Sequence, residues 1–385
     1  MDFALSEDQD RLREMVARFC EERIKPRAAA IDEAGEYPRE LFLELADLGF
    51  FGLRYPDSLG GAGLGMLSYC LAIGEIARGS LSLAAAAAMQ SLMGTHFLYA
   101  FGNADIHERL LKPAIRGEKI GAICITEPNA GSDLSAIATK AQKVSGGYRL
   151  NGQKTWITSA PVADFFTVFA RTSEEAVLTI FLVERDFPGL QVGRAIEKMG
   201  TWPLPTSEVF FDNCIVPEDH RLGEEGQGES ALRAILADVR ILTGALATGT
   251  ARAALEEALQ YSAQRKQFGK VINSFQAIQL YLAEMATDLE AATHLVHYAA
   301  WLKDNNRPCQ REAAMAKLFA TERAVDICDK ATRILGSYGF AMEFAAQRHL
   351  RDIRFTLYGG GTSEILKLII AKDMTSQITQ DASGR

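Results

Sequence analysis

The spacing of apolar residues changes twice along the chain and divides it into three regions. In the first, Leu12, Val16 and Phe19 fall on one face of a predicted helix. Ser6 and Gln9 stand before this face at the spacing of a capping box, which predicts where the helix begins. Further helices are predicted at 41–48, 67–78, 83–101 and 106–116, so this region is expected to be mainly helical.

The second region begins near Gly121 and has short apolar runs separated by Gly, Pro, Asp and Asn. Several short strands with frequent turn signals are typical of a small β-barrel or sandwich. Asn151-Gly152 is a favoured two-residue hairpin turn, and it predicts that 148–150 pairs with 154–156. Further strands are predicted at 165–170, 178–183 and 208–211.

The third region follows Gly226-Gln227-Gly228 and returns to helical spacing. Long helices are predicted at 230–264, 276–305 and 311–335, with a fourth after a glycine triplet at 359–361. Four antiparallel helices are the natural arrangement. Small residues predict close helix packing on the first of them: Thr243, Gly244, Ala247 and Gly249.

The predicted fold class is therefore multidomain α+β. It has an N-terminal α-helical domain (1–120), a middle β-barrel domain (121–225) and a C-terminal four-helix bundle (226–385).

Composition narrows the function classes. The chain has 385 residues, 48% of them hydrophobic, which is enough for a large buried core. A net charge of −8 argues against nucleic acid as a partner. Six scattered cysteines without a C-x-x-C pair, and an acidic N-terminus unlike a signal peptide, favour a cytoplasmic protein. The most apolar run, 81–93, is too short to span a membrane.

Three stretches are candidates for binding chemistry, and each also has a purely structural interpretation. The glycine triplet opens a helix at Thr362, and a helix N-terminus suits a phosphate, although short glycine loops are common. Trp156 offers a flat ring beside Thr158, although a lone Trp in a strand is usually a core residue. Arg265 follows a long helix, where it can clamp a phosphate or simply complement the helix dipole.

Taken together, these stretches resemble the acyl-CoA dehydrogenase family over essentially the whole chain. The motifs are Thr126-Glu127-Pro128, Gly131-Ser132-Asp133, Asn151-Gly152-x-Lys154-x-Trp156-Ile157-Thr158, Arg265-x-x-Phe268-Gly269, Leu335-Gly336-x-x-Gly339, Arg351-Asp352 and Gly361-Thr362-Ser363. The resemblance implies a homotetrameric FAD flavoprotein that oxidises an acyl thioester and passes electrons to an electron-transfer flavoprotein.

The resemblance also implies which residues hold FAD. The loop and strand contacts would be Ile123, Ile125, Thr126, Ser132, Trp156 and Thr158, with the Thr158 hydroxyl near flavin N5. A neighbouring subunit's FAD would meet Arg265, Phe268 and Gln276, and a further pyrophosphate contact would involve Arg333 and Ser337. Family members often have Gln where this chain has Arg333. The last contacts would be Thr362 and Glu364.

Substrate contacts are implied in the same way. Ser132 and Arg240 match positions that touch the CoA part, and Gly361 is also expected at the substrate. Met89 belongs to the segment that resembles the acyl-pocket helix, where Ala84 to Ala88 would leave room for a branched or cyclic acyl group. Close helix packing explains these alanines equally well. The thioester carbonyl would accept a hydrogen bond from the backbone N–H of Gly360.

The chain departs from the family at the catalytic base. Dehydrogenation requires a carboxylate that removes the α-proton. Many members have Glu where this chain has Gly360, and others have it at the position of Val239. Asp238 is one residue away but about 100° round the helix, so a shifted register or a π-bulge would be required to make it the base.

Other polar residues are weaker candidates. Tyr358 and Glu364 flank the triplet, and His96 is more typical of a structural residue on an apolar helix. His294 and His297 lie at i, i+3 without a carboxylate pair, so no metal site is predicted.

Three explanations of the missing Glu remain open. The chain is a dehydrogenase with a base at an atypical position, acting on a branched, cyclic or unsaturated acyl-CoA. Alternatively, it performs different flavin chemistry: an O2-using monooxygenase or N-oxidase reaction, or an elimination that needs no base. In the third explanation it is a non-catalytic flavin-binding subunit. The acyl group, its chain length and its carrier, CoA or an acyl-carrier protein, are not determined by these residues.

Overall fold

The computed structural model describes residues 4–172 and 177–383, and side chains up to residue 376. The N-terminal part is helical, with α1 (Glu7–Phe19), α2 (Ala28–Ala34), α3 (Arg39–Asp47), α4 (Met66–Gly79), α5 (Leu81–Ala88), α6 (His96–Phe101), α7 (Ala104–Ile106) and α8 (Lys112–Ile115). The Ser6 hydroxyl and the Gln9 side chain each accept the other residue's backbone N–H, so the predicted capping box is confirmed. A π-helical segment, η5 (Met89–Gly94), joins α5 to α6.

The middle part is a sheet. Its strands are β1 (Gly121–Cys124), β2 (Lys140–Val144), β3 (Gly147–Thr158), β4 (Phe165–Thr172), β5 (Val177–Glu184), β6 (Leu190–Ala195), β7 (Thr206–Pro217) and β8 (Arg221–Leu222). Within the described residues they form one eight-stranded sheet in the order β6-β7-β3-β2-β4-β5-β8, with β1 paired to β4. Large apolar side chains of these strands are fully buried, among them Tyr148, Phe165, Phe169 and Phe181.

The hairpin prediction at Asn151-Gly152 is wrong. β3 runs without a turn from Gly147 to Thr158, and its hairpin partner is β2. A Cβ on Gly152 would lie 2.5 Å from Thr139 Oγ1, so this glycine permits close approach of β2 at an irregularity in the β3–β7 register. The Asn151 Oδ1 atom accepts the Asn213 backbone N–H at 2.9 Å instead of closing a turn.

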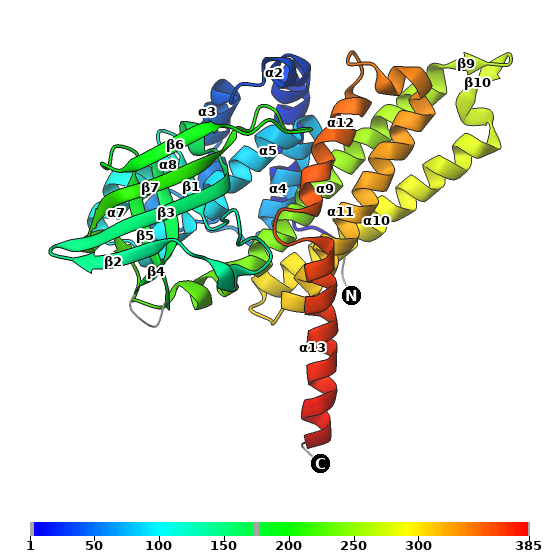
Figure 1. Cartoon of the computed structure of the whole chain (residues 1–385). Helices are drawn as coiled ribbons and strands as arrows, with labels where there is room; N and C mark the ends of the chain where they lie inside the picture. The colour runs from blue at the N-terminus through cyan, green and yellow to red at the C-terminus, as the bar shows by residue number, and fades with distance from the viewer. Residues whose placement is uncertain (1–3, 173–176, 384–385) are drawn as a thin grey trace.

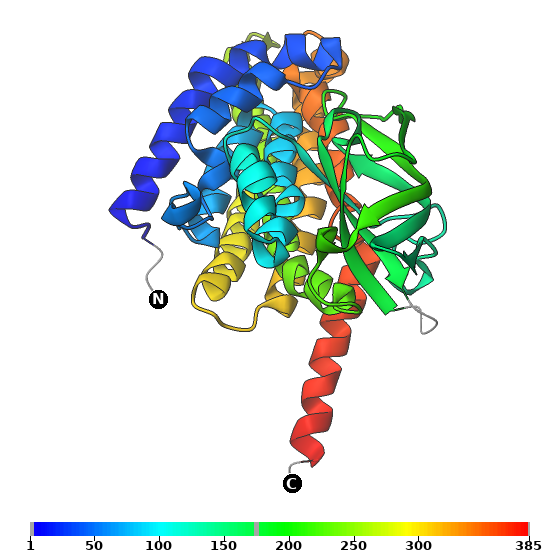
Figure 2. The ribbon, with the colours of Figure 1, turned by 90° about the vertical axis from the view of Figure 1, so that its left-hand side faces the viewer.

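The C-terminal part contains α9 (Gly228–Gln264), α10 (Gln276–Asp304), α11 (Gln310–Leu335), α12 (Ala345–Ile353) and α13 (Ser363–Ser383), with a small hairpin of β9 (Lys266–Gln267) and β10 (Lys270–Val271). The helices α9, α10 and α11 pack on one another. The short α12, which the apolar spacing did not indicate, packs on α9 and α11. The fourth predicted long helix, α13, packs on α11 near its N-terminus, and its remainder projects away from the rest of the chain (Figure 1; Figure 2).

The N-terminal helices link the other two parts. The helix α4 packs on α9, whereas β1 contacts η5 (Figure 1). Gly249 on α9 faces the backbone of α4, because a Cβ there would lie 2.2 Å from the Gly74 carbonyl oxygen. A Cβ on Gly244 would lie 2.7 Å from Val296 of α10. The small-residue face predicted on this helix therefore packs closely against two helices.

The Gly249→Ala variant is expected to be less stable than the wild type by about 1–3 kcal/mol, because the added methyl overpacks the α4–α9 contact. Its matched control is Gly74→Ala, whose Cβ would meet only the Ala245 carbonyl oxygen, at 3.7 Å. The control is expected to be neutral or more stable, since Ala is favoured over Gly in a helix by about 1 kcal/mol. Urea unfolding monitored by circular dichroism measures both, and equal stability of the two variants would contradict this packing.

Candidate active site

The glycine triplet lies against the middle of α9. Gly360 and Gly361 have φ values of +73° and +104°, which glycine adopts readily, and they lead into the N-terminus of α13. A Cβ on Gly360 would lie 3.3 Å from Thr243 Oγ1 and 3.4 Å from Val239 Cγ1. The two positions at which the family resemblance places a base are therefore neighbours in space, and neither carries a carboxylate.

A buried lysine holds this loop in place. Lys317 of α11 donates hydrogen bonds to the carbonyl oxygens of Leu357, at 3.0 Å, and Gly361, at 2.8 Å. Its side chain is fully buried, and burial lowers its pKa to about 8. Sequence reasoning missed Lys317. The available signal was a single charge on a helical face that is otherwise alanine, at positions 313, 316 and 320.

Asp238 has cationic partners of its own. Arg54 Nη2 donates to Asp238 Oδ2 at 2.8 Å, and Lys303 Nζ forms an ion pair with Oδ1 at 2.7 Å without hydrogen-bond geometry. The residue is only 3% exposed. The helix α9 runs through this point as regular α-helix, without the π-bulge that would turn Asp238 toward Val239. This geometry favours a structural role for the Asp238 carboxylate.

The remaining candidate bases differ in environment. Tyr358 is exposed, and so is Glu364, whose pKa is lowered by a backbone N–H and by the Thr362 hydroxyl. Burial lowers the pKa of His96 to about 4, with a smaller effect of Arg54, so its imidazole is neutral near pH 7. Burial also lowers the pKa of His297 to about 4.

Trp156 is not a core residue, despite its place in a strand. It is 56% exposed and has a φ of +59°, at an irregularity in the register of β3 with β7. A large exposed ring held in a rarely adopted conformation is typical of a ligand contact. Thr158, two residues further, is half-buried and pairs with Thr206 of β7.

The loop after β1 is fixed to this same strand. Thr126 accepts the Thr155 backbone N–H at 2.9 Å through its carbonyl oxygen. Lys154 Nζ, fully buried, donates to the Ile125 carbonyl oxygen and to Glu127 Oε1, at 3.0 and 2.7 Å. The predicted loop contacts Ile125 and Thr126 are thus held beside Trp156. Ile123 is buried in β1, whereas Ser132 is exposed on the loop.

Five predicted FAD contacts lie elsewhere, around the C-terminal ends of α9 and α11 and the N-terminal end of α10. These are Arg265, Phe268, Gln276, Arg333 and Ser337, and all are exposed. Phe268 is 93% exposed with a φ of +50° on the β9–β10 hairpin, which Figure 1 shows at the far end of the long helices from the sheet. Arg265 follows α9, roughly 37 Å along the helix axis from Arg240 at 1.5 Å per residue. The predicted FAD contacts therefore form two groups that are separated within one chain.

The alanines of the predicted acyl-pocket segment are all buried. Ala84 to Ala88 are at most 5% exposed within α5, and Met89 follows them, half-buried, at the start of η5. This burial fits a closely packed helix, and π-helical turns such as η5 are frequent at functional sites.

The first group of residues fits a flavin. It offers an exposed indole, half-buried hydroxyls at Thr126 and Thr158, and a helix N-terminus at Thr362 that suits a phosphate. The chemistry of these groups suits a flat ring system with a pyrophosphate.

Comparison with known proteins agrees with this set of features. Models of the acyl-CoA dehydrogenase N-terminal, middle and C-terminal domains match residues 6–118, 122–214 and 226–375. The chain belongs to the acyl-CoA dehydrogenase family. The predicted order of helical, sheet and helical domains is confirmed, and FAD is the cofactor.

Benzylmalonyl-CoA dehydrogenase of Aromatoleum aromaticum is 67% identical over 98% of this chain and 100% of its own length. A chain in the solved structure of the electron-transferring flavoprotein of Acidaminococcus fermentans is 36% identical, with a TM-score of 0.94 over 97% of this chain and 99% of that chain. The structure of PigA with FAD and proline is 31% identical, with a TM-score of 0.94 over 97% of this chain and 99% of PigA.

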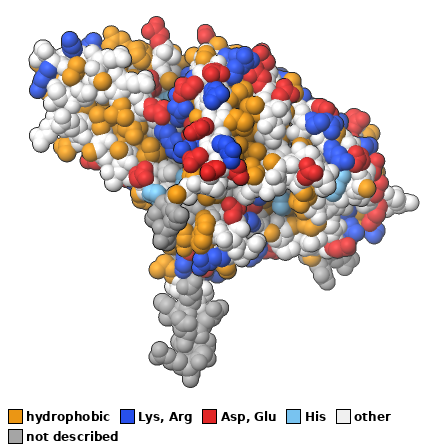
Figure 3. All heavy atoms as spheres, turned by 180° about the vertical axis from the view of Figure 1, so that it is seen from behind, with side chains coloured by type: hydrophobic (Ala, Val, Ile, Leu, Met, Phe, Trp, Pro, Cys, Tyr) orange, Lys and Arg blue, Asp and Glu red, His pale blue; other side chains and the backbone are white. Residues whose placement is uncertain are grey.

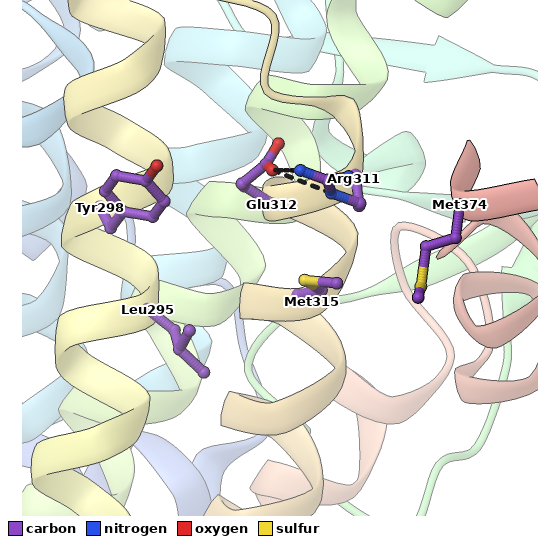
Figure 4. Close-up of a pocket in the computed structure, with 6 residues that line it drawn as sticks. All are labelled: Leu295, Tyr298, Arg311, Glu312, Met315 and Met374. Atoms are coloured by element: carbon purple, nitrogen blue, oxygen red, sulfur yellow. Dashed lines mark hydrogen bonds and ion pairs between the residues drawn. The ribbon is translucent and has the colours of Figure 1, made fainter. Parts of the chain in front are cut away.

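A separate hollow of about 350 Å³ lies among α10, α11 and α13 (Figure 4). It is lined by Leu295, Tyr298, Arg311, Glu312, Met315 and Met374. In the close-up, Arg311 bonds its neighbour Glu312 at the upper edge, and the two methionines lie below. None of the predicted substrate or FAD residues lines this hollow.

Two further findings concern the described residues as a whole. They contain no cluster of three metal-ligating side chains and no helix long and apolar enough to cross a membrane. On the face seen in Figure 3, Lys and Arg side chains are interspersed with Asp and Glu.

The buried charge of Lys317 predicts a pH dependence of stability. Its pKa is about 8 when folded and ordinarily 10.5, so between these values the unfolded chain binds the extra proton. Raising the pH from 7.5 to 9.5 therefore stabilises the wild type relative to Lys317→Met, by about 2 kcal/mol. The control is Lys330→Met, which lies on the same helix as Lys317 and removes only a surface ion pair with Glu284 of α10. Urea unfolding at both pH values measures the effect, and a parallel shift in all three proteins would contradict it.

Proposed function

We propose that this protein is an FAD-dependent dehydrogenase of an acyl-CoA whose α-carbon carries a carboxylate, such as an aryl-substituted malonyl-CoA. The observation that carries the proposal is the contact of Gly360 with Val239 and Thr243. Both expected positions of the base converge there, and the side chains present are a hydrogen, an isopropyl group and a hydroxyl. In the proposal, the α-carboxylate of the substrate supplies the anionic group that relatives with Glu supply themselves.

A substrate carboxylate on Cα changes the chemistry that the protein must supply. An ordinary acyl thioester needs a base, because the electron pair for the new double bond comes from the Cα–H bond. In a malonyl thioester, cleavage of the Cα–carboxylate bond releases CO2, and the electron pair of that bond forms the Cα=Cβ bond. Bound FAD supplies the acceptor that takes one hydrogen and two electrons from Cβ. The products are an α,β-unsaturated thioester and CO2, and no base is required.

The name of the relative from Aromatoleum aromaticum supports this substrate class. That protein is a benzylmalonyl-CoA dehydrogenase, and it matches 98% of this chain at 67% identity. The Asp238 carboxylate, the nearest one on α9, is paired with Arg54 and Lys303. A carboxylate held by two cations is a poor base, which supports a reaction that needs none.

The chain's own residues position the reactants. Lys317 fixes the carbonyl groups of Leu357 and Gly361, so the intervening Gly360 N–H is held where the thioester oxygen is expected. Trp156 and Thr158 form the flavin side, and the Thr158 hydroxyl is the proposed donor near N5. Ser132 and Gly361 are proposed contacts of the thioester ligand.

The separation of the two FAD groups supports assembly from several copies. Arg265 and Phe268 follow the C-terminal end of α9, at the far end of the long helices from the sheet that carries Trp156 (Figure 1). We infer that they, with Gln276, Arg333 and Ser337, meet the FAD of a second copy in a homotetramer. An electron-transfer flavoprotein is the proposed electron acceptor.

The reaction is tested by its products. The FAD-loaded enzyme, benzylmalonyl-CoA and an artificial electron acceptor are expected to yield one CO2 per double bond formed, measured with a 13C-labelled carboxyl group and mass spectrometry. A product that retains the label would establish instead a base-dependent dehydrogenation from an atypical position. Flavin that stays oxidised with every thioester would overturn the dehydrogenase proposal itself.

Introducing a base at position 239 should change which acyl-CoA the enzyme oxidises. Val239→Glu places a carboxylate beside Gly360, so we expect oxidation of 3-phenylpropionyl-CoA, which lacks the α-carboxylate, to rise at least about tenfold. Repulsion between like charges should at the same time weaken binding of benzylmalonyl-CoA. Val239→Gln has the same shape without a base and is the matched control. Dye reduction under anaerobic conditions measures both rates, and the proposal is wrong if Gln and Glu behave alike.

A further inference from the structure

Arg240 is a buried cation without a carboxylate partner. It is 7% exposed, and it follows Val239 directly on α9. Its Nε atom has no hydrogen-bond partner, and within residues 4–172 and 177–383 no ion pair to it is found. Burial lowers the pKa of its guanidinium group. Burying an unpaired charge is strongly unfavourable, so such a group is expected where a ligand supplies the counter-charge.

The neighbours of Arg240 indicate which ligand group is near. Arg240 precedes Thr243 by three positions, so the two share a helical face, and Thr243 Oγ1 is among the atoms nearest to Gly360. The positive charge of Arg240 also contributes to lowering the pKa of Lys317, the residue that donates to the Leu357 and Gly361 carbonyl oxygens. Two buried cations without ion-pair partners among the described side chains thus flank the loop where the thioester is expected.

Charge elsewhere on α9 is treated differently. Arg252, twelve residues further along, forms an ion pair with Glu75 at 2.9 Å, and Asp238 has two cationic partners. Arg240 has no such partner among the described residues, and it lies one residue from the position where the base is missing.

We propose that Arg240 binds the α-carboxylate of the substrate and selects carboxylated over uncarboxylated acyl-CoA. This inference rests on the proposed function and names the residue that recognises its substrate class. A guanidinium binds a carboxylate through two parallel hydrogen bonds, which fixes the plane of the carboxylate as well as its position. Because this contact stabilises the bound carboxylate and not the departing CO2, it acts on affinity and orientation.

The family resemblance gave Arg240 a different ligand, the CoA part of the substrate, and the two assignments predict different binding data. A contact with CoA affects every acyl-CoA equally. A contact with the α-carboxylate affects only ligands that carry it. Benzylmalonyl-CoA and 3-phenylpropionyl-CoA differ only by the α-carboxylate. The ratio of their dissociation constants therefore measures what the α-carboxylate contributes to binding.

The test is calorimetric titration, with each ligand under nitrogen, of the FAD-loaded enzyme whose flavin has first been reduced chemically, so that neither ligand can be oxidised and the heat reports binding. We expect the wild type to bind benzylmalonyl-CoA more tightly, and Arg240→Met to lose at least about tenfold of that preference. Arg240→Lys keeps the charge without the planar fork and is expected to retain part of it. Arg252→Met, on the same helix, should leave the ratio unchanged.

The outcomes separate the two proposals. Equal weakening of both ligands by Arg240→Met or Arg240→Lys would overturn the carboxylate assignment and favour a CoA contact. If Arg240→Met does not fold, Arg240→Lys with an unchanged ratio would likewise overturn it. A wild type that oxidises 3-phenylpropionyl-CoA as well as benzylmalonyl-CoA, without CO2 release, would refute the proposed function whatever the variants do.

Discussion

The site depends on the contact between the glycine loop at 359–361 and the middle of α9. Glycine makes this contact possible, because the loop passes Val239 and Thr243 with a φ of +73° and without a side chain of its own. Lys317 secures the loop from the other side through two carbonyl oxygens. A buried ammonium group is expensive, and here the backbone acceptors offset part of that cost.

This arrangement links the unusual sequence to the proposed chemistry. Family members place the base either at the position of Gly360 or at the position of Val239. Here neither residue carries a carboxylate. Two buried cations near these positions have no ion-pair partner among the described side chains: Arg240, and Lys317, which donates to carbonyl oxygens. A site that contains unpaired cations and no carboxylate base is complementary to an anionic substrate. A carboxylated acyl group therefore fits it better than an uncarboxylated acyl group.

Several predictions from the sequence agree with the structure because they rest on short-range physics. The capping box at Ser6 and Gln9, and the boundaries of the long helices, follow from periodicity and local hydrogen bonding. The Asn151-Gly152 hairpin failed because the same dipeptide also permits close approach within a continuous strand, and pairing with β2 decides between the two. Trp156 was ambiguous because exposure depends on which face of β3 the rest of the fold covers.

The sequence by itself determined the family, the order of its domains and the lack of a carboxylate at 239 and 360, since motifs and residue identities are local properties. Only the tertiary structure decided that these two positions touch, that Asp238 is paired with Arg54 and Lys303, and that Arg240 is buried without a partner. These are contacts between segments up to 184 positions apart. Helical periodicity fixes which residues share a face, but which face meets which depends on the packing of the whole core.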